Sequence, residues 1–442
     1  MKKKSMLWLV LGLVIVVSMM LAACTPAAAP VAEEPAAEPE VVEEPVAEEA
    51  PVVEEAPEVE PAVVAYWHTM SDPETAQLDL VIADFEAANP GITIEATRYS
   101  WDDFKPAVLT ALAGGAAPDA ARMDIAWVSE FADQGALMQL DGVMPGFEEI
   151  AADAFPGPLS TNYWQGHYYG LPQNTNTQVL LWNREVLAAA EYTEAPQTMG
   201  EFQEVACAIS DAANEKYGYA LGGTYFWAPA PIFYAMGGKV VDEGITTATG
   251  YVNSAESVAA FTMLTDMYND GCISPNLLGG GVGTSDGLAT GMYAMIIDGP
   301  WMVDIYKGQY PDFEVNFAPI PTADGVTSSV VGGEDVVIFY DTDVADAAMK
   351  WTAYLMSPES QLKMAQVGVI PTLSSLIGNA ELPEYFGVFL DQLQTAQARV
   401  PHPAWSDMDS AISNAFQRML RGDQSPQEAL DQAADEINAL LK

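Results

Sequence analysis

Nine of the ten tryptophans lie after residue 62, and several stand in segments of turn or loop composition rather than on apolar helix stripes. An indole ring offers a flat apolar face that packs against the C–H-rich face of a sugar ring. The tryptophans that we predict to serve this purpose are Trp67, Trp101, Trp127, Trp227, Trp301 and Trp405. Trp182 and Trp351 instead follow the patterns of a buried strand and a helix, and we assign them to the core.

A sugar site also needs planar polar side chains that bind hydroxyl groups in pairs. The carboxylates that could accept such bonds are Asp119, Asp124, Asp298 and Glu334. Arg399 could donate a forked pair of hydrogen bonds. For each acid a solvated surface position is the competing interpretation, because the chain is rich in carboxylates. Asp119 follows Pro118 and has a further alternative as a structural turn residue.

Residues 283–287 match the G-x-S-x-G pattern of a hydrolase nucleophile elbow. That motif should follow a buried strand and open a helix. Here the flexible segment 279–281 precedes it, and the only histidine further along the chain is His402. We therefore predict that the protein is not an enzyme, and an extracellular hydrolase is a minor alternative.

Metal and nucleotide chemistry have no support in the sequence. His68, His167 and His402 stand apart, without the spacing of metal ligands. No phosphate-binding loop of the G-x-x-x-x-G-K-[ST] type occurs, so any ATPase that serves this protein is a separate chain. We predict neither a metal nor a cofactor.

The first residues form a secretory signal. Lys2 to Lys4 precede an apolar run from Met6 to Leu21, which is short for a spanning helix. Leu21-Ala22-Ala23-Cys24 then matches a lipobox. We predict a signal peptide over 1–23 and lipidation of Cys24, with an uncleaved signal anchor as the alternative. The protein should be extracytoplasmic and attached to the outer face of the cell membrane by its lipid alone.

Residues 24–62 should form an extended, disordered tether. After Cys24 and Thr25 this segment consists of Ala, Pro, Val and Glu, with 12 Glu and no basic residue, so it cannot bury a core. The whole chain has a formal net charge of −46. Such a surface repels nucleic acid and anionic lipid headgroups, and it favours neutral or cationic solutes.

About 380 residues remain after the tether, more than one hydrophobic core usually holds, so we expect two lobes. Strand-like and helix-like segments alternate along this body, which predicts an α/β fold. The expected strands are 63–67, 92–96, 178–182, 292–297 and 336–339. The expected helices are 71–89, 104–112, 199–210 and 255–268, a capped segment near 127–137, and a last helix opened by a capping box at 425–428.

Two cysteines remain in the body, Cys207 and Cys272. An oxidising compartment allows them to pair. Sequence spacing does not place their Cα atoms together, so a disulfide and two free thiols both stay open.

Several short segments follow one another in the order found in a known family. They include residues 84–92, 117–119, 170–172 with 180–183, 293–295 with 299–301, and 425–430. In this order, and behind a lipobox, they resemble the extracellular solute-binding proteins of group 1, the relatives of maltose-binding protein. The resemblance covers nearly the whole body.

The resemblance implies a class II periplasmic-binding-protein fold, in which two α/β lobes are joined by a multi-crossing hinge and a monomer binds its ligand between them. The crossings would lie near 174–178, 332–335 and 371–375. The lobes would then be discontinuous, with 63–174 and about 335–371 in the first, and 175–334 and about 372–442 in the second.

The resemblance also ranks the candidate residues. Trp301 follows Asp298-Gly299-Pro300, where similar proteins present a ring to the sugar. The triplet Tyr225-Phe226-Trp227 and the segment before Trp405 resemble further ligand contacts. Asn174 and Asn176 lie at the first crossing, where they replace an acidic residue of maltose-binding protein, which argues against maltose-like specificity.

Taken together, the sequence predicts a lipoprotein that captures a mono- or oligosaccharide and delivers it to an ABC importer, whose permease subunits and ATPase are separate proteins. The main alternative is a polyamine or another cationic solute, which acidic and aromatic clefts also bind. A surface scaffold without a closing cleft is a further alternative.

Overall fold

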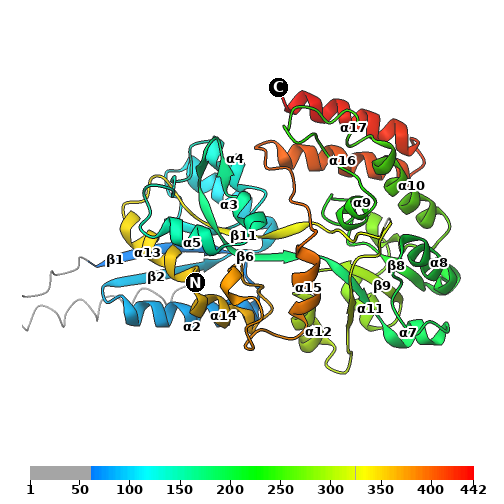
Figure 1. Cartoon of the computed structure of the whole chain (residues 1–442), viewed down its shortest axis with the longest axis horizontal. Helices are drawn as coiled ribbons and strands as arrows, with labels where there is room; N and C mark the ends of the chain where they lie inside the picture. The colour runs from blue at the N-terminus through cyan, green and yellow to red at the C-terminus, as the bar shows by residue number, and fades with distance from the viewer. Residues whose placement is uncertain (1–60, 324) are drawn as a thin grey trace, which may run out of the picture. The chain divides into compact units, whose positions relative to one another are not determined.

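The computed structural model describes residues 61–323 and 325–442 (Figure 1). The predicted signal peptide, the lipidation of Cys24 and nearly all of the tether fall outside these ranges. Among the described residues, no helix is both long and apolar enough to cross a membrane.

The first lobe is built on a five-stranded sheet with the order β2-β1-β3-β11-β6. These strands are β1 (Ala62–His68), β2 (Ile92–Arg98), β3 (Ala120–Asp124), β6 (Gly170–Thr177) and β11 (Val331–Ile338). β1 runs parallel to β2 and β3, whereas β11 is antiparallel to both β3 and β6. This mixed sheet confirms the predicted α/β class.

Helices cover both faces of this sheet because successive strand residues point to opposite sides. Ala120 packs in the cluster under α2 (Asp72–Ala88), α13 (Ala345–Leu355) and α14 (Pro358–Ala365). The next residue, Ala121, packs under α3 (Trp101–Ala113) and α4 (Val128–Asp133). Smaller elements complete the lobe: α5 (Phe147–Asp153), α6 (Pro156–Ser160) and the hairpin of β4 (Tyr163–Trp164) and β5 (His167–Tyr168).

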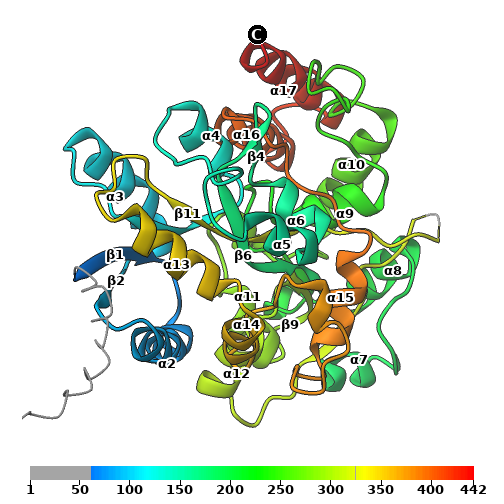
Figure 2. The same cartoon turned by 60° about the vertical axis from the view of Figure 1, so that its left-hand side comes forward.

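The second lobe has a four-stranded sheet with the order β10-β7-β9-β8. Its strands are β7 (Val179–Trp182), β8 (Tyr217–Ala220), β9 (Tyr293–Asp298) and β10 (Asn316–Ala318). One face carries α8 (Met199–Ile209), α9 (Ala230–Ala235), α10 (Ala255–Asn269), α16 (Trp405–Leu420) and α17 (Pro426–Leu440). The other face carries α11 (Thr284–Ala289), α12 (Met302–Gln309) and α15 (Phe386–Leu393). α7 (Arg184–Ala189) follows β7, and α10, α16 and α17 lie side by side in both views (Figures 1 and 2).

The capping signals in the sequence fix several helix starts. Ser71 and Glu74 form the capping box of α2, and Ser425 and Glu428 form that of α17, each with Pro in the first turn. Three tryptophans expected in turn or loop segments lie in regular elements instead: Trp67 in β1, and, as first helical residues, Trp101 in α3 and Trp405 in α16. The indole rings of Trp101 and Trp405 are therefore placed by helices.

The hinge crossings expected near 174–178 and 332–335 stay predictions, and the strands show where the chain changes sheet. β6 ends at Thr177 in the first sheet and β7 begins at Val179 in the second, with only Gln178 between them. β11 returns the chain to the first sheet. The third crossing, expected near 371–375, also stays a prediction; Ile370 packs with the second-lobe core and Leu373 with the first-lobe core.

Cys207 and Cys272 form a disulfide, which resolves the alternative that their spacing left open. Cys207 lies in α8, and Cys272 follows α10 beside β8, where its carbonyl accepts a hydrogen bond from Tyr219. The bond closes a loop of the second lobe with a sequence separation of 65.

We expect the double variant Cys207→Ala/Cys272→Ala to lose about 2–4 kcal/mol of unfolding free energy, because the unfolded chain regains the entropy that the cross-link removes. Urea unfolding measures this loss. Reduction of the wild-type protein should produce the same decrease, whereas the variant should not respond to reductant. Equal stability of wild type and variant would contradict a structural role for the bond.

Candidate functional site

A cavity of about 140 Å³ lies where the two lobes and the hinge strands meet. It is lined by Thr69, Glu74, Trp101, Arg122, Asn174, Thr175, Asn176, Pro300, Trp301, Glu334, Gly368, Val369 and Ile370. The first lobe, the hinge segments and the second lobe all contribute to this set. We call it the interlobe cleft.

A buried ionic network forms the floor of the interlobe cleft. Arg122 donates from Nη2 to Glu334 Oε2 at 2.5 Å, from Nε to Asn174 Oδ1 at 3.1 Å and from Nη1 to Thr69 Oγ1 at 3.1 Å. Asn174 Nδ2 also donates to Glu334 Oε2 at 2.6 Å. Burial raises the pKa of Glu334, while Arg122 and then Asn174 oppose the rise. The network fixes the ends of β3, β6 and β11 relative to one another.

Asn176 supplies a hydrogen-bonding group beside this network. Its side chain is buried, and Oδ1 has no hydrogen-bond partner among the described residues. Gly332 leaves the space for this amide, since a Cβ there would lie 2.2 Å from Asn176 Oδ1 and 2.4 Å from the ring of Trp227. A buried acceptor of this kind is costly unless a partner satisfies it, and a ligand hydroxyl group would do so.

Aromatic rings from both lobes form the walls. Trp101 stands at the start of α3 with 46% of its surface exposed, and its ring centroid lies 5.1 Å from that of Trp127. Trp301 follows β9 and is half-buried, with its ring 6.4 Å from that of Trp227. One indole face of each lobe therefore borders the same cavity.

Arg399 was predicted to donate a forked pair of hydrogen bonds to a ligand, but a single nitrogen of its guanidinium group contacts Asp124 instead. Nη2 of Arg399 lies 3.0 Å from Asp124 Oδ1 and 3.1 Å from Oδ2. The guanidinium carbon lies 5.4 Å from the ring centroid of Trp227. Asp124 and Arg399 lie next to the interlobe cleft, but neither of them lines it.

Other predicted residues lie elsewhere. Trp67 packs on Tyr99 with ring centroids 4.6 Å apart. Asp119 accepts from the Ala65 amide at 2.8 Å and from Thr342 Oγ1 at 2.6 Å, which fits the structural-turn alternative. Trp405 is 2% exposed and packs in the core of the second lobe, so no face of its ring is open to a solute.

Tyr225 shortly precedes Trp227 in the sequence and Asp298 shortly precedes Trp301, but neither Tyr225 nor Asp298 lines the interlobe cleft. Tyr225 is 48% exposed in the loop that carries Trp227. Asp298 ends β9, three residues before Trp301, and accepts from the Gly299 amide at 2.8 Å. Burial raises the pKa of Asp298 to about 6.

The sequence analysis missed Thr69, Glu74, Arg122 and residues 368–370. One signal for Arg122 was available, because an arginine inside the apolar strand segment 120–125 must find a buried partner. Thr69 precedes the start of α2 and Glu74 lies in its first turn; the sequence pattern there predicted a helix start and no ligand contact. Gly368, Val369 and Ile370 reach the interlobe cleft through the third hinge segment, which no local pattern reveals.

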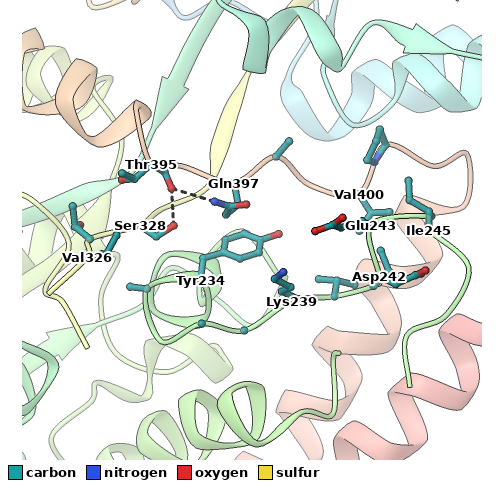
Figure 3. A pocket seen from close by; sticks show the side chains of 18 residues that line it. Tyr234, Lys239, Asp242, Glu243, Ile245, Val326, Ser328, Thr395, Gln397 and Val400 are labelled. Carbon is teal, nitrogen blue, oxygen red and sulfur yellow. Dashed lines mark hydrogen bonds between the residues drawn. The ribbon is translucent and has the colours of Figure 1, made fainter. Parts of the chain in front are cut away.

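Cavities of larger volume lie away from this site, including one of about 530 Å³ bordered by Arg184 and Asn316. Another, about 820 Å³, is bordered by Tyr234, Lys239 and Glu243 and by the segment with Thr395 and Gln397 (Figure 3). Ser328 Oγ donates to the Thr395 carbonyl at 2.8 Å along its edge. A third, about 690 Å³, lies along α15 and has mostly apolar lining. None of the three contains the paired indole faces or the buried ionic floor.

Comparison with known proteins defines the class. A model of the bacterial extracellular solute-binding protein family matches residues 81–386, more than half of the chain. The chain belongs to this family, which confirms the resemblance seen in the sequence.

Within the described ranges, no three His, Cys, Asp or Glu side chains gather in a position to hold a metal ion.

Individual relatives and solved structures have low sequence identity to this chain. The chain is 25% identical over 400 residues to the maltotriose-binding protein of Pyrococcus abyssi, covering 86% of this chain and 80% of that one. The GacH receptor of Streptomyces glaucescens, solved without ligand and with acarbose, aligns with a TM-score of 0.77 at 23% identity, covering 86% and 98%. A solute-binding protein of Thermotoga lettingae, solved with α-D-tagatose, aligns with a TM-score of 0.77 at 26% identity, covering 86% and 100%. These similarities confirm the two-lobed periplasmic-binding-protein fold.

Removal of one residue from the ionic network of the cleft floor should lower the stability of the folded protein. We expect Arg122→Ala to lower the unfolding free energy by about 3–5 kcal/mol, because Glu334 would stay buried without its counter-charge. Arg98→Ala, which removes the exposed pair between Arg98 and Asp72, is the control and should cost less than about 1 kcal/mol. Urea unfolding compares the two variants, and similar losses would contradict a buried network.

Asp335 follows Glu334 on β11, but its carboxyl group lies in a different environment from that of Glu334. Asp335 is fully buried, and its Oδ2 lies 3.0 Å from Thr161 Oγ1 on the side of β11 away from the cleft floor. Burial raises the pKa of Asp335 from 3.8 to about 8, against the opposing effect of bonds from Asn162 and Thr161. The folded protein therefore holds a proton here that the unfolded chain releases at much lower pH.

This shift predicts a pH dependence of stability. The contribution of protonated Asp335 is complete below about pH 4 and declines as the pH rises to about 8, because the folded state binds the additional proton over that interval. Asp335→Asn should not show this decline, so its stability relative to wild type should increase across the interval. Urea unfolding at several pH values tests this, and a constant difference would contradict it.

Proposed function

We propose that this protein is an extracytoplasmic lipoprotein that binds a carbohydrate between its two lobes and delivers it to an ABC importer. The observation that carries the proposal is the interlobe cleft, in which Trp101 and Trp301 present indole faces from opposite lobes above polar hinge residues. Flat apolar faces together with fixed hydrogen-bonding groups are what a sugar ring requires. The sugars named for the relatives agree with this ligand class.

The proposed lobes are 63–174 with about 335–371, and 175–334 with about 372–442. Binding would shift the population between open and closed arrangements, since a ligand that contacts both lobes binds the closed form more tightly. Polar contacts already join the lobes outside the cleft. Lys105 on α3 donates across the lobes to Ser406 on α16 at 2.9 Å, and it is held within the first lobe by Glu130 on α4 at 2.6 Å.

The remaining parts of the proposal follow from the sequence and the family. Lipidation at Cys24 would hold the protein at the outer face of the membrane, and a relative from Streptomyces antibioticus is described as a lipoprotein. The importer's permease would recognise the closed, ligand-bound monomer. No chemical step is needed, so the protein acts as a binding protein and not as an enzyme.

The alternatives fit the cleft less well. A polyamine would meet the guanidinium groups of Arg122 and Arg399 in or beside the interlobe cleft, while the acids nearest to them are already paired. The G-x-S-x-G segment begins α11, and a 3-10 turn (Pro275–Leu278) precedes it in place of the strand that a hydrolase elbow requires.

A thermal-shift screen tests the proposed function. The purified protein would be heated with monosaccharides, oligosaccharides, polyamines and amino acids. A ligand that binds only the folded state adds about 2.7 kcal/mol of stability at a hundredfold excess over its dissociation constant. A shift with saccharides supports the proposal. A shift with polyamines alone, or no shift across the panel, contradicts it.

Single tryptophan variants test the site. Trp301→Ala and Trp101→Ala should each weaken saccharide binding by more than about 1 kcal/mol, because each removes a stacking face. Tyr340→Ala removes an aromatic ring that is 67% exposed on the first lobe and should leave the affinity unchanged. Isothermal titration calorimetry measures all three. Unchanged affinity in either tryptophan variant would remove that ring from the site.

A further inference from the structure

The ion pair of Asp124 and Arg399 joins the two lobes. Asp124 ends β3 in the first sheet, and Arg399 lies in the segment that leads into α16 of the second lobe. Their side chains are only 7% and 12% exposed, and the amide of Ala126 donates a further hydrogen bond to Asp124 Oδ1 at 2.7 Å. One guanidinium nitrogen of Arg399 reaches both carboxylate oxygens of Asp124, and such a charge-assisted contact holds the two side chains together.

This pair stands at one boundary of the interlobe cleft. In the pairing of β3 with β11, Asp124 lies opposite Glu334, which belongs to the cleft floor. Arg399 lies over the ring of Trp227, and the same ring borders Gly332 next to Asn176. The pair is therefore adjacent to the floor on the β3 side, where a longer cleft would have to continue.

The other boundaries of the cleft are also occupied. Trp101 and Trp301 form its walls, and Gly368 to Ile370 close the side of the third hinge segment. The volume of this partly open cleft, about 140 Å³, is well below the about 300–1,000 Å³ of pockets that bind drug-sized ligands. A single sugar ring matches this space better than a chain of rings.

We propose that the Asp124–Arg399 pair terminates the cleft and restricts it to ligands with one sugar ring. A disaccharide or trisaccharide would have to separate the two charges while they remain shielded from water, which opposes binding. Arg399 is then a specificity-determining residue that acts through Asp124 and Trp227 and does not donate to the ligand. This inference rests on the proposed carbohydrate function and adds the length of the ligand.

The test compares homologous saccharides of one, two and three rings. Isothermal titration calorimetry of the purified protein would use glucose, maltose and maltotriose, then mannose, mannobiose and mannotriose, with tagatose as a further monosaccharide. The monosaccharide of the preferred series should bind at least tenfold more tightly than its trisaccharide. Equal or tighter binding of the trisaccharide would overturn the length limit and leave the proposed function standing. Failure of every saccharide would overturn the proposed function itself.

A charge-free variant tests the role of the ion pair. Asp124→Ala with Arg399→Ala removes both charges together, so that neither remains buried alone, and should reduce the preference for one ring at least fivefold. The control, Asp84→Ala with Lys363→Ala, removes an ion pair between α2 and α14 outside the cleft and should leave the preference unchanged. An unchanged preference in the first variant would overturn the assignment.

If the alanine pair does not fold, Asp124→Asn with Arg399→Gln replaces it. These substitutions retain the side-chain volume and remove the charges, so the preference should change in the same direction by a smaller factor. Melting temperatures confirm which variants are folded before titration. An unchanged preference in this folded variant would equally overturn the role of the pair.

Discussion

The need to satisfy one buried guanidinium group determines how the hinge strands meet. Arg122 lies in β3 with little exposure, and it cannot lose its charge. Its donors reach Thr69 after β1, Asn174 on β6 and Glu334 on β11. A shift in the register of any of these strands would leave a charge without a partner in the interior, which costs far more than most surface changes. The cleft floor is therefore a consequence of strand pairing.

The same arrangement explains why the site lies where the lobes meet. β6 and β11 are neighbours in the first sheet; β6 leads into the second lobe and β11 returns from it, so residues where the two strands pass between the lobes face the interlobe space. Asn174 and Asn176 are separated by one residue on β6; the first completes the ionic floor, and the second leaves Oδ1 free toward the cleft. Movement of the lobes about these strands would change the walls more than the floor, which suits a ligand that is held first by hinge residues.

Local sequence signals predicted most of the secondary structure and part of the site. Ser71 and Ser425 marked helix starts correctly because an N-cap is satisfied within a few residues of the chain. Trp101, Trp301 and Glu334 were recognised as candidates and do line the interlobe cleft. Trp405 was misplaced because burial of an indole ring depends on distant helices, here those that meet Phe226. The partner of Arg399 was equally out of reach, since Asp124 lies far away in sequence.

The charge distribution argues for a neutral ligand. The chain carries a formal net charge of −46, yet Glu334 in the cleft floor is matched by Arg122, and Asp124 at its border by Arg399. Glu74, the other acid that lines the cleft, accepts from the Ser71 amide in the capping box of α2. Paired charges leave local dipoles in place of a net field, and dipoles orient hydroxyl groups without favouring an ion of either sign. An acidic exterior alone would have favoured cations. The pairing inside the cleft removes that preference, and what remains is a small polar cavity between indole faces, suited to an uncharged polyhydroxylated ring.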